Sequence, residues 1–355
     1  KALVPLFERM NALCDLLGHR REQRGSIDFD LPTARFQFDK SGQIEAIVAD
    51  SRTTAHRIIE EFMLVANETV ASDLCRHKVP TLFRVHEAPD PLKVEEFNGF
   101  ISSIGYSLAA PTASVEPEHF QKLLFRVKGE PEERPIAALM LRTMQQARYE
   151  PTNQGHFGLA AQAYAHFTSP IRRYPDLLVH RALHAVHGGA LTQETRRLWM
   201  ERMPTLARHT SEKERRAEDA ERELVQWKKV RFMADKVGDE FSGYVTGVTA
   251  FGLFVELVEQ FVEGLVHISS MADDYYRFVE SQYLLRGENS GKSYRLGDLV
   301  HVQLVRVDRA HRQLDLGLTE ILEAVRSKEK KGASRPGRSA RSAPRVPNRK
   351  RRRRR

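Results

Sequence analysis

Apolar residues recur at helical spacing in three long stretches of the chain. Residues 3–23 and 54–76 each carry such a face, and we predict a long helix in both. A third helix is predicted at residues 211–235, because Ser211 followed by Glu214 forms a capping-box pattern at its start. Between the first two helices, alternation of apolar and polar residues predicts short strands at residues 26–30, 35–38 and 44–48.

After residue 235 the pattern changes to short alternating segments separated by glycines. Strands are predicted at residues 241–245, 252–255, 264–267, 299–305 and 313–316. Five short strands with glycine corners are typical of an OB-fold barrel. We therefore predict an α+β chain in three parts: a mixed body (1–235), an all-β five-stranded barrel (236–318) and a tail (319–355).

The positive charge of the chain is concentrated at its end. Residues 326–355 hold fifteen lysines and arginines and a single acid, Glu329, a net charge of +14. Because the whole chain carries +9, the other 325 residues carry −5. The tail has few large apolar residues and is expected to be disordered. A basic tail of this kind favours single-stranded RNA, the ribosome or other polyanions as partners.

Composition also excludes several classes of protein. The two cysteines, Cys14 and Cys75, rule out a disulfide framework and a cysteine-based zinc site. No apolar run approaches the ~18 residues needed to span a membrane. We expect a monomeric cytoplasmic protein without a signal peptide. Since Lys1 is not an initiator methionine, we also expect a fragment of a longer chain.

Residues 164–180 (YAHFTSPIRRYPDLLVH) carry the densest chemistry in the sequence. Pro170 and Pro175 fix the backbone, so a stiff loop is predicted ahead of a helix that starts near Pro175. The loop presents Arg172 and Arg173. On the residues alone two interpretations stay open: the arginines pair with carboxylates in a structural corner, or their planar guanidiniums bind phosphate.

This stretch resembles the signature of the ribonuclease II/ribonuclease R family, the RNB exoribonucleases. Three upstream segments are similar to the same family in the same order: residues 58–67 (IIEEFMLVAN), 141–149 (LRTMQQARY) and 155–160 (GHFGLA). The resemblance implies the C-terminal part of an RNB catalytic domain. It also implies a magnesium-dependent 3′→5′ exoribonuclease that hydrolyses single-stranded RNA processively to nucleoside 5′-monophosphates.

The resemblance assigns roles to residues near the scissile bond. Arg172 is expected to hold the scissile phosphate, and Arg173 to support phosphate binding or the loop. Glu221 is expected to orient the terminal nucleotide or the attacking water. Its position fits a buried carboxylate that needs a partner, because it falls on a predicted apolar stripe formed by Ala217, Ala220, Leu224 and Trp227.

Further roles are implied at the substrate end. Phe29 is expected to stack on the 3′-terminal bases, and Glu60 or Glu61 to accept a hydrogen bond from the ribose. The sequence does not separate the two glutamates. Without the resemblance, Phe29 reads as a core aromatic and the glutamates as solvated charges on a helix.

The predicted barrel has a resemblance of its own. Residues 247–257 (GVTAFGLFVEL), 263–269 (EGLVHIS) and 305–318 closely resemble the S1-type RNA-binding domain. Exposed aromatic residues beside a cation are how OB folds hold single strands. The resemblance places this face on Phe251, Phe254, His267, Asp308 and Arg312.

The aspartate cluster that binds magnesium in this family is not evident. The nearest pairs, Asp28 with Asp30 and Asp273 with Asp274, do not lie in a matching context. We therefore expect no metal ligands in this chain, and expect the chain alone to be inactive as a nuclease. The alternative function is a non-catalytic RNA-binding protein built on a degenerate or truncated nuclease domain.

Deletion of residues 326–355 is expected to flatten the salt dependence of RNA affinity, because each basic residue that contacts a phosphate releases a counterion. Dissociation constants for one single-stranded RNA, measured by fluorescence anisotropy across a salt series, give the slope. An unchanged slope would show that the tail does not contribute.

Overall fold

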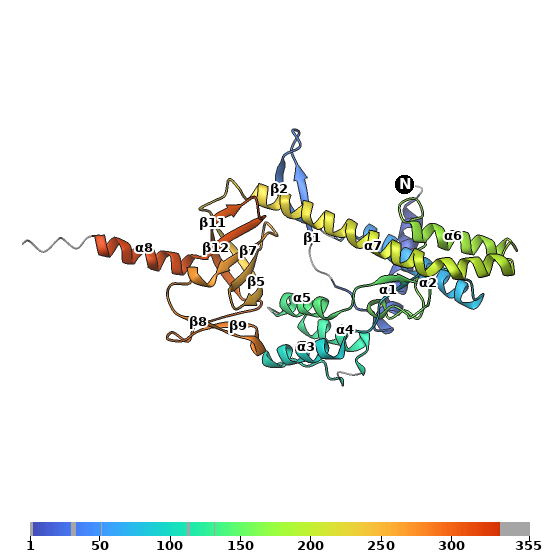
Figure 1. The fold of residues 1–355 in the computed structure, drawn as a ribbon, viewed down its shortest axis with the longest axis horizontal. Helices are drawn as coiled ribbons and strands as arrows, with labels where there is room; N and C mark the ends of the chain where they lie inside the picture. Colours follow the sequence, from blue (N-terminus) through green and yellow to red (C-terminus); the bar gives the residue numbers. More distant parts are fainter. Residues whose placement is uncertain (1–2, 30–32, 51, 112–113, 131, 334–355) are drawn as a thin grey trace, which may run out of the picture.

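The computed structural model describes residues 3–29, 33–50, 52–111, 114–130 and 132–333. It contains a helix-rich body, a closed β-barrel and one 40-residue helix that runs from the first to the second (Figure 1). The predicted α+β class with a five-stranded barrel after the mixed body is confirmed. Within the described ranges, no helix has the length and apolarity that a membrane crossing requires.

Two long helices form one side of the body. Helix α1 (Val4–Gln23) packs beside α2 (Thr54–Arg76), and both lie where the helical periodicity of the sequence places them. Helix α2 begins at Thr53, whose hydroxyl accepts from the His56 backbone amide at 3.3 Å. Buried positions of α2, among them Glu61 and Asn67, face the rest of the body.

The other side of the body has a core of its own. Helices α3 (Pro91–Ser103), α4 (Pro117–Val127) and α5 (Glu133–Thr143) enclose fully buried aromatic and aliphatic side chains. Phe97 and Phe120 are the largest of these, and Met140 is fully buried beside them. A short antiparallel ribbon of β3 (Phe83–Val85) and β4 (Arg148–Glu150) and helix α6 (Tyr174–His187) complete the body.

Helix α7 (Gln193–Phe232) connects the body to the barrel without interruption. The predicted helix start at Ser211 is wrong, because Thr192 caps the helix by accepting from the Thr195 amide at 3.1 Å. Ser211 lies in the middle of α7. Its hydroxyl donates to the Ala207 carbonyl at 2.8 Å and accepts from the Tyr149 amide at 3.0 Å. The hydroxyl therefore fastens β4 to the helix.

The barrel closes in the order β11-β12-β7-β6-β5. The strands are β5 (Glu240–Thr249), β6 (Gly252–Leu257), β7 (Glu263–His267), β11 (Leu299–Asp308) and β12 (Gln313–Leu318). Gly252 has φ +153°, and a Cβ there would lie 2.2 Å from the Val266 carbonyl oxygen. Only glycine fits this approach of β6 to β7.

Two elements around the barrel were not predicted. A three-stranded sheet of β8 (Tyr276–Val279), β9 (Leu284–Gly287) and β10 (Ser293–Arg295) lies between β7 and β11 in the chain. Helix α8 (Thr319–Ala333) packs on β11 and β12 through buried Ile321. The expectation of a disordered tail is therefore wrong for residues 319–333, and residues 334–355 lie outside the described part.

The hairpin of β1 (Thr33–Phe38) and β2 (Ile44–Asp50) belongs to the barrel core although it precedes α2 in the chain. Buried Ile47 is in one hydrophobic cluster with the barrel interior and the end of α7, and Phe36 packs against that cluster. Figure 1 shows the hairpin rising beside the barrel end of α7. The hairpin therefore ties the first part of the sequence to the last.

The strand predicted at residues 26–30 is absent from residues 26–29, and Asp30 lies outside the described residues. These residues bond to other parts of the body instead of to a neighbouring strand. The Ile27 amide donates to the Gly158 carbonyl at 2.8 Å, and the Gln121 side-chain amide donates to the Ser26 carbonyl at 2.9 Å.

Ile47→Ala is expected to lower the free energy of unfolding by roughly 2 kcal/mol or more, because it removes buried apolar volume between hairpin and barrel. Urea denaturation followed by circular dichroism measures the change. Ile59→Ala on α2 is the matched control, since Ile59 is 53% exposed. Equal losses in both variants would contradict the packing described here.

Candidate functional site

The loop before α6 is organised around a carboxylate without exposed surface. Asp176 lies in the first turn of α6 and is 0% exposed. Its Oδ1 accepts from the Ser169 backbone amide at 2.8 Å and from the Arg173 guanidinium at 2.8 Å. Arg173 is thereby held as a structural cation, as the first interpretation of the arginine pair expects.

Arg172 has the opposite environment. It is exposed, and its guanidinium makes no hydrogen bond or ion pair within the part of the chain that the structure describes. Its neighbour Ile171 is 99% exposed. Among the described residues, the loop between the prolines therefore leaves the Arg172 guanidinium without a partner and pairs the Arg173 guanidinium with Asp176.

Buried polar contacts fasten this loop to α2. The Asn67 side chain donates to the Tyr164 hydroxyl at 2.9 Å and accepts from the Phe167 amide at 3.0 Å. His180 of α6 stacks on Phe167 at 4.2 Å between ring centroids. The start of the loop is thus fastened to α2 by Asn67 and to α6 by the stacking of His180 on Phe167.

Tyr149, Tyr164 and His166 form a cluster of rings at the start of the loop. The Tyr149 hydroxyl is 2.8 Å from His166 Nδ1, and Arg84 forms an ion pair with Glu214 of α7 next to it. Burial, with the nearby charges of Arg173 and Arg84, lowers the pKa of His166 to about 3. His166 is therefore neutral near pH 7 and serves as a hydrogen-bonding partner.

Glu221 lies in the C-terminal half of α7. The prediction that this face of the helix is buried is wrong. Glu221 is exposed, and Leu224 and Trp227 of the same stripe are 53% and 43% exposed. The physical reason is that this part of α7 runs between body and barrel, where Leu224 and Trp227 remain largely exposed to solvent. The Glu221 carboxylate has no hydrogen-bond or ion-pair partner among the described residues.

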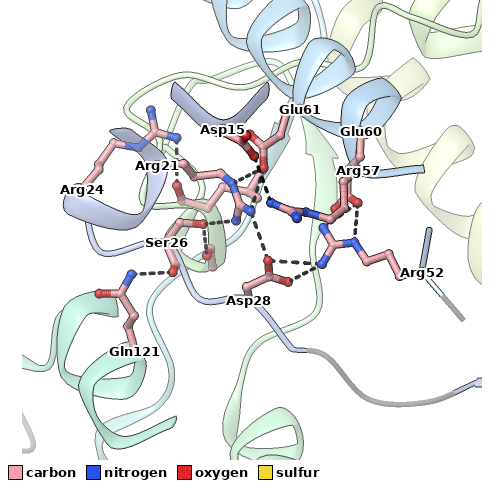
Figure 2. A network of polar contacts seen from close by, with 12 residues as sticks. Asp15, Arg21, Arg24, Ser26, Asp28, Arg52, Arg57, Glu60, Glu61 and Gln121 are labelled. Atoms are coloured by element: carbon pink, nitrogen blue, oxygen red, sulfur yellow. Dashed lines mark hydrogen bonds and ion pairs between the residues drawn. The ribbon is translucent and has the colours of Figure 1, made fainter. Parts of the chain in front are cut away.

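A network of charges contacts Ser26 and Asp28, shortly before Phe29 in the chain (Figure 2). Arg21 of α1 donates to Glu61 at 2.8 and 3.0 Å, to Ser26 at 3.1 Å and to Asp28 at 3.1 Å. Arg52 donates to Asp28 at 3.2 Å and to Glu60 at 2.6 Å. Burial alone would raise the pKa of the Asp28 carboxyl, but Arg21 and Arg52 hold that pKa below its usual range.

The structure separates the two glutamates that the sequence left equivalent. Glu61 is buried, 6% exposed, and is bound by Arg21. The Glu60 side chain is 44% exposed at the edge of the network. Phe29 is half-buried and packs against the core that contains Ile27 and Phe120.

The barrel presents the predicted phenylalanines next to each other. Phe251 is 47% exposed, and its ring meets the half-buried Phe254 ring edge-on at 5.9 Å. Exposed His267 follows on the paired strand, where Gly252 lies opposite it. The pair of phenylalanine rings and exposed His267 thus come from neighbouring parts of the barrel surface.

Asp308 and Arg312 are already engaged within the protein. Asp308 accepts from the Ala310 and His311 amides at 3.0 and 2.9 Å, and these bonds lower its pKa to about 2. Arg312 donates to Glu223 of α7 at 2.9 Å. The two residues shape the β11–β12 turn and fasten it to α7.

No magnesium ligand set is assembled by the described residues. Among them, no three His, Cys, Asp or Glu side chains are grouped so that they could hold a metal ion. Asp273 and Asp274 are engaged separately: Asp273 accepts from Tyr276, and Asp274 accepts from the Asn289 and Ser290 amides.

Comparison with known proteins identifies two domains in the chain. The RNB domain matches residues 3–189, and the S1 RNA binding domain matches residues 234–319. The chain is 45% identical over 322 residues to Ribonuclease R of Aquifex aeolicus, which covers 90% of the chain and 45% of that protein. It is 40% identical over 344 residues to Ribonuclease R of Escherichia coli, in an alignment that covers 93% of this chain and 42% of that protein. The chain thus spans less than half the length of these relatives.

A solved structure agrees with these matches. RNase R of Mycoplasma genitalium, in complex with ribose methylated single-stranded RNA, aligns with a TM-score of 0.83 at 27% identity. The alignment covers 88% of this chain and 49% of the other chain.

The buried neutral histidine predicts how stability depends on pH. Unfolding returns His166 to its ordinary pKa of 6.5, so the unfolded state binds more protons between about pH 6.5 and 3. The free energy of unfolding is therefore expected to fall as the pH drops through this window. His166→Gln should fall less steeply than wild type in urea denaturation at a series of pH values.

His209→Gln on α7 is the control for this experiment, because His209 is exposed. Identical pH dependence in His166→Gln and wild type would show that His166 does not titrate differently in the folded state.

Proposed function

This chain belongs to the RNB family, and we propose that it serves a ribonuclease R-like 3′→5′ exoribonuclease activity. The proposed reaction is processive hydrolysis of single-stranded RNA to nucleoside 5′-monophosphates. The single observation that carries the proposal is that Arg172 is exposed and has no side-chain partner among the described residues, on a loop that Asp176 and Asn67 hold in place. A fixed guanidinium of this kind suits a phosphate whose charge increases during the reaction.

Arg173 and Glu221 are proposed to act around that phosphate. Arg173 supports the loop through its ion pair with Asp176. Glu221 orients the terminal nucleotide or the attacking water. Its exposure and lack of a partner in the described residues leave the carboxylate available to substrate.

The terminal nucleotide is proposed to lie against α2 and the segment before β1. Glu60 accepts from the ribose 2′-hydroxyl, because Glu61 is buried and committed to Arg21. Phe29 stacks on a base with the part of its ring that remains exposed. Asn67, which ties the Arg172 loop to α2, lies seven residues after Glu60, about 10 Å along the helix.

The barrel is proposed to hold RNA upstream of the reacting end. Phe251, Phe254 and His267 offer the stacking surface, and Arg312 and Asp308 keep the adjoining turn in place. The basic residues after Arg326 add contacts to RNA, the ribosome or other polyanions. A monomer in the cytoplasm is the proposed working form.

Magnesium is proposed as the cofactor of the complete reaction, where it would activate water and stabilise the leaving oxygen. The described residues do not offer a fitting ligand set, so we derive no step through the ion. For the same reason, the 355-residue chain alone is proposed to bind RNA without hydrolysing it.

A non-catalytic RNA-binding protein is the second candidate. The lack of a carboxylate cluster in the described part favours it. A chimera separates the two functions: residues 3–319 replace the matching region of the Aquifex aeolicus relative. Release of nucleoside 5′-monophosphates with magnesium supports the enzyme, and RNA binding without release supports the binding protein.

In that chimera, Arg172→Ala is expected to lower kcat by about 10²–10³ while RNA affinity falls by no more than about tenfold. The reason is that a phosphate carrying increasing charge gains more from the guanidinium than the ground-state phosphate does. Rapid-quench hydrolysis and fluorescence anisotropy measure the two quantities.

Arg197→Ala is the control, because Arg197 is an exposed arginine of α7 that pairs only with exposed Glu201 among the described residues. Equal losses of hydrolysis and binding in Arg172→Ala would assign Arg172 to anchoring alone.

A further inference from the structure

We propose that Arg21 is a positioning residue that sets Phe29 and Glu60 at a fixed separation for the terminal nucleotide. The inference rests on the proposed function, because that function gives Phe29 and Glu60 their ligand. The proposal gives Arg21 a role that acts through Phe29 and Glu60 without contact to RNA. No feature of the sequence singled out Arg21.

The segment that carries Phe29 has no regular structure to hold it. Residues 26–29 follow the turn after α1 and belong to neither a helix nor a strand. Their backbone is fixed by the Gly158 carbonyl at Ile27 and by the Gln121 side chain at Ser26. Both backbone contacts act at the start of the segment. Phe29 also packs against the core around Ile27, whereas Asp28 depends on its side-chain contacts for its position.

The Arg21 guanidinium supplies side-chain contacts that restrain Ser26 and Asp28. Its side chain is 14% exposed and lies between α1, α2 and the segment (Figure 2). Nε and Nη2 donate to Glu61, Nη1 donates to Ser26, and Nη2 also donates to Asp28. The Arg21 guanidinium thus connects Ser26 and Asp28 of the segment to Glu61 of α2.

The network continues to the exposed glutamate. Asp28 also accepts from Arg52 at 3.2 and 3.3 Å, and Arg52 binds Glu60 through Nε and Nη2 at 3.0 and 2.6 Å. The charges alternate from Glu61 through Arg21, Asp28 and Arg52 to Glu60. Phe29 follows Asp28 directly, so this path links the proposed base-stacking residue to the proposed ribose-binding residue.

The two halves of the network differ in how firmly they are held. The Arg52 and Asp28 side chains are 27% and 45% exposed, and water competes for their contacts. Arg21 and Glu61 are 14% and 7% exposed, and the pair is shielded from water. Arg21 therefore fixes the geometry, and Arg52 extends it to Glu60.

Arg21→Lys tests the proposal, since it keeps the charge beside buried Glu61 but loses the fork that reaches three residues at once. The full chain is bound in EDTA to single-stranded RNA with 2-aminopurine either at its 3′ end or at an internal position. In wild type, stacking on Phe29 is expected to quench the terminal label. In Arg21→Lys we expect the terminal quench to fall by about half or more, while affinity changes by less than about threefold.

Three further variants complete the experiment. Phe29→Ala defines the complete loss of terminal quenching. Asp28→Asn removes the negative charge that Arg21 and Arg52 both bind and is expected to give the same partial loss as Arg21→Lys. Arg24→Lys is the matched control: it lies one turn along, binds Glu68 at 2.7 Å and does not contact Asp28.

The outcomes distinguish this proposal from the function on which it rests. Wild-type terminal quenching that persists in folded Arg21→Lys and Asp28→Asn overturns the role of Arg21 alone. Absence of terminal quenching in wild type, or quenching that persists in Phe29→Ala, overturns the proposed stacking by Phe29 and the positioning role with it. An equal loss in Arg24→Lys shows a general effect of α1 and also overturns the proposal.

Discussion

The Asp176 carboxylate, with no exposed surface, determines which chemistry the Arg172 loop can offer. An ionised carboxylate in the protein interior needs a cation and further donors. Asp176 obtains a cation from Arg173, three residues before it, and one donor from the Ser169 amide, seven residues before it, both at Oδ1. Of the two adjacent guanidiniums, Arg173 pairs with Asp176, and Arg172 remains exposed. The identical neighbours in the sequence thus acquire different roles.

The same constraint acts a second time on α2. Glu61 is buried and takes the guanidinium of Arg21, whereas Glu60 stays at the edge with Arg52. In both pairs, burial separates a structural residue from one that remains accessible. The two sites are joined by Asn67, which connects α2 to the backbone of the loop. Rigidity around the candidate site therefore comes from buried polar contacts between irregular segments and helices.

The sequence predicted the elements whose signal is local. Helical periodicity placed α1 and α2, and glycine-separated alternation placed the barrel, because each pattern repeats within a few residues. Ser211 was misread because the same hydroxyl that caps a helix can bind a distant amide, here that of Tyr149. The stripe at Glu221 was misread because periodicity marks apolar positions and does not reveal whether a partner covers them.

The candidate site depended on contacts that no local pattern contains. Arg21 lies 40 residues from Glu61, and Arg52 lies 24 residues from Asp28. Nothing in their spacing distinguishes these arginines from the many others in the chain. The resemblance to a family named Arg172, Phe29 and either Glu60 or Glu61, but the residues that hold them in place emerged only from the fold.

The β1–β2 hairpin changes what counts as a module in this protein. Its apolar residues share a hydrophobic cluster with the closed barrel, although some 190 residues separate Ile47 from the first barrel strand. Excision of the barrel at its own ends would expose Ile47 of the hairpin and the barrel side chains of that cluster. Evolutionary exchange of the barrel for another would require a compatible hairpin to be inherited from a different part of the gene.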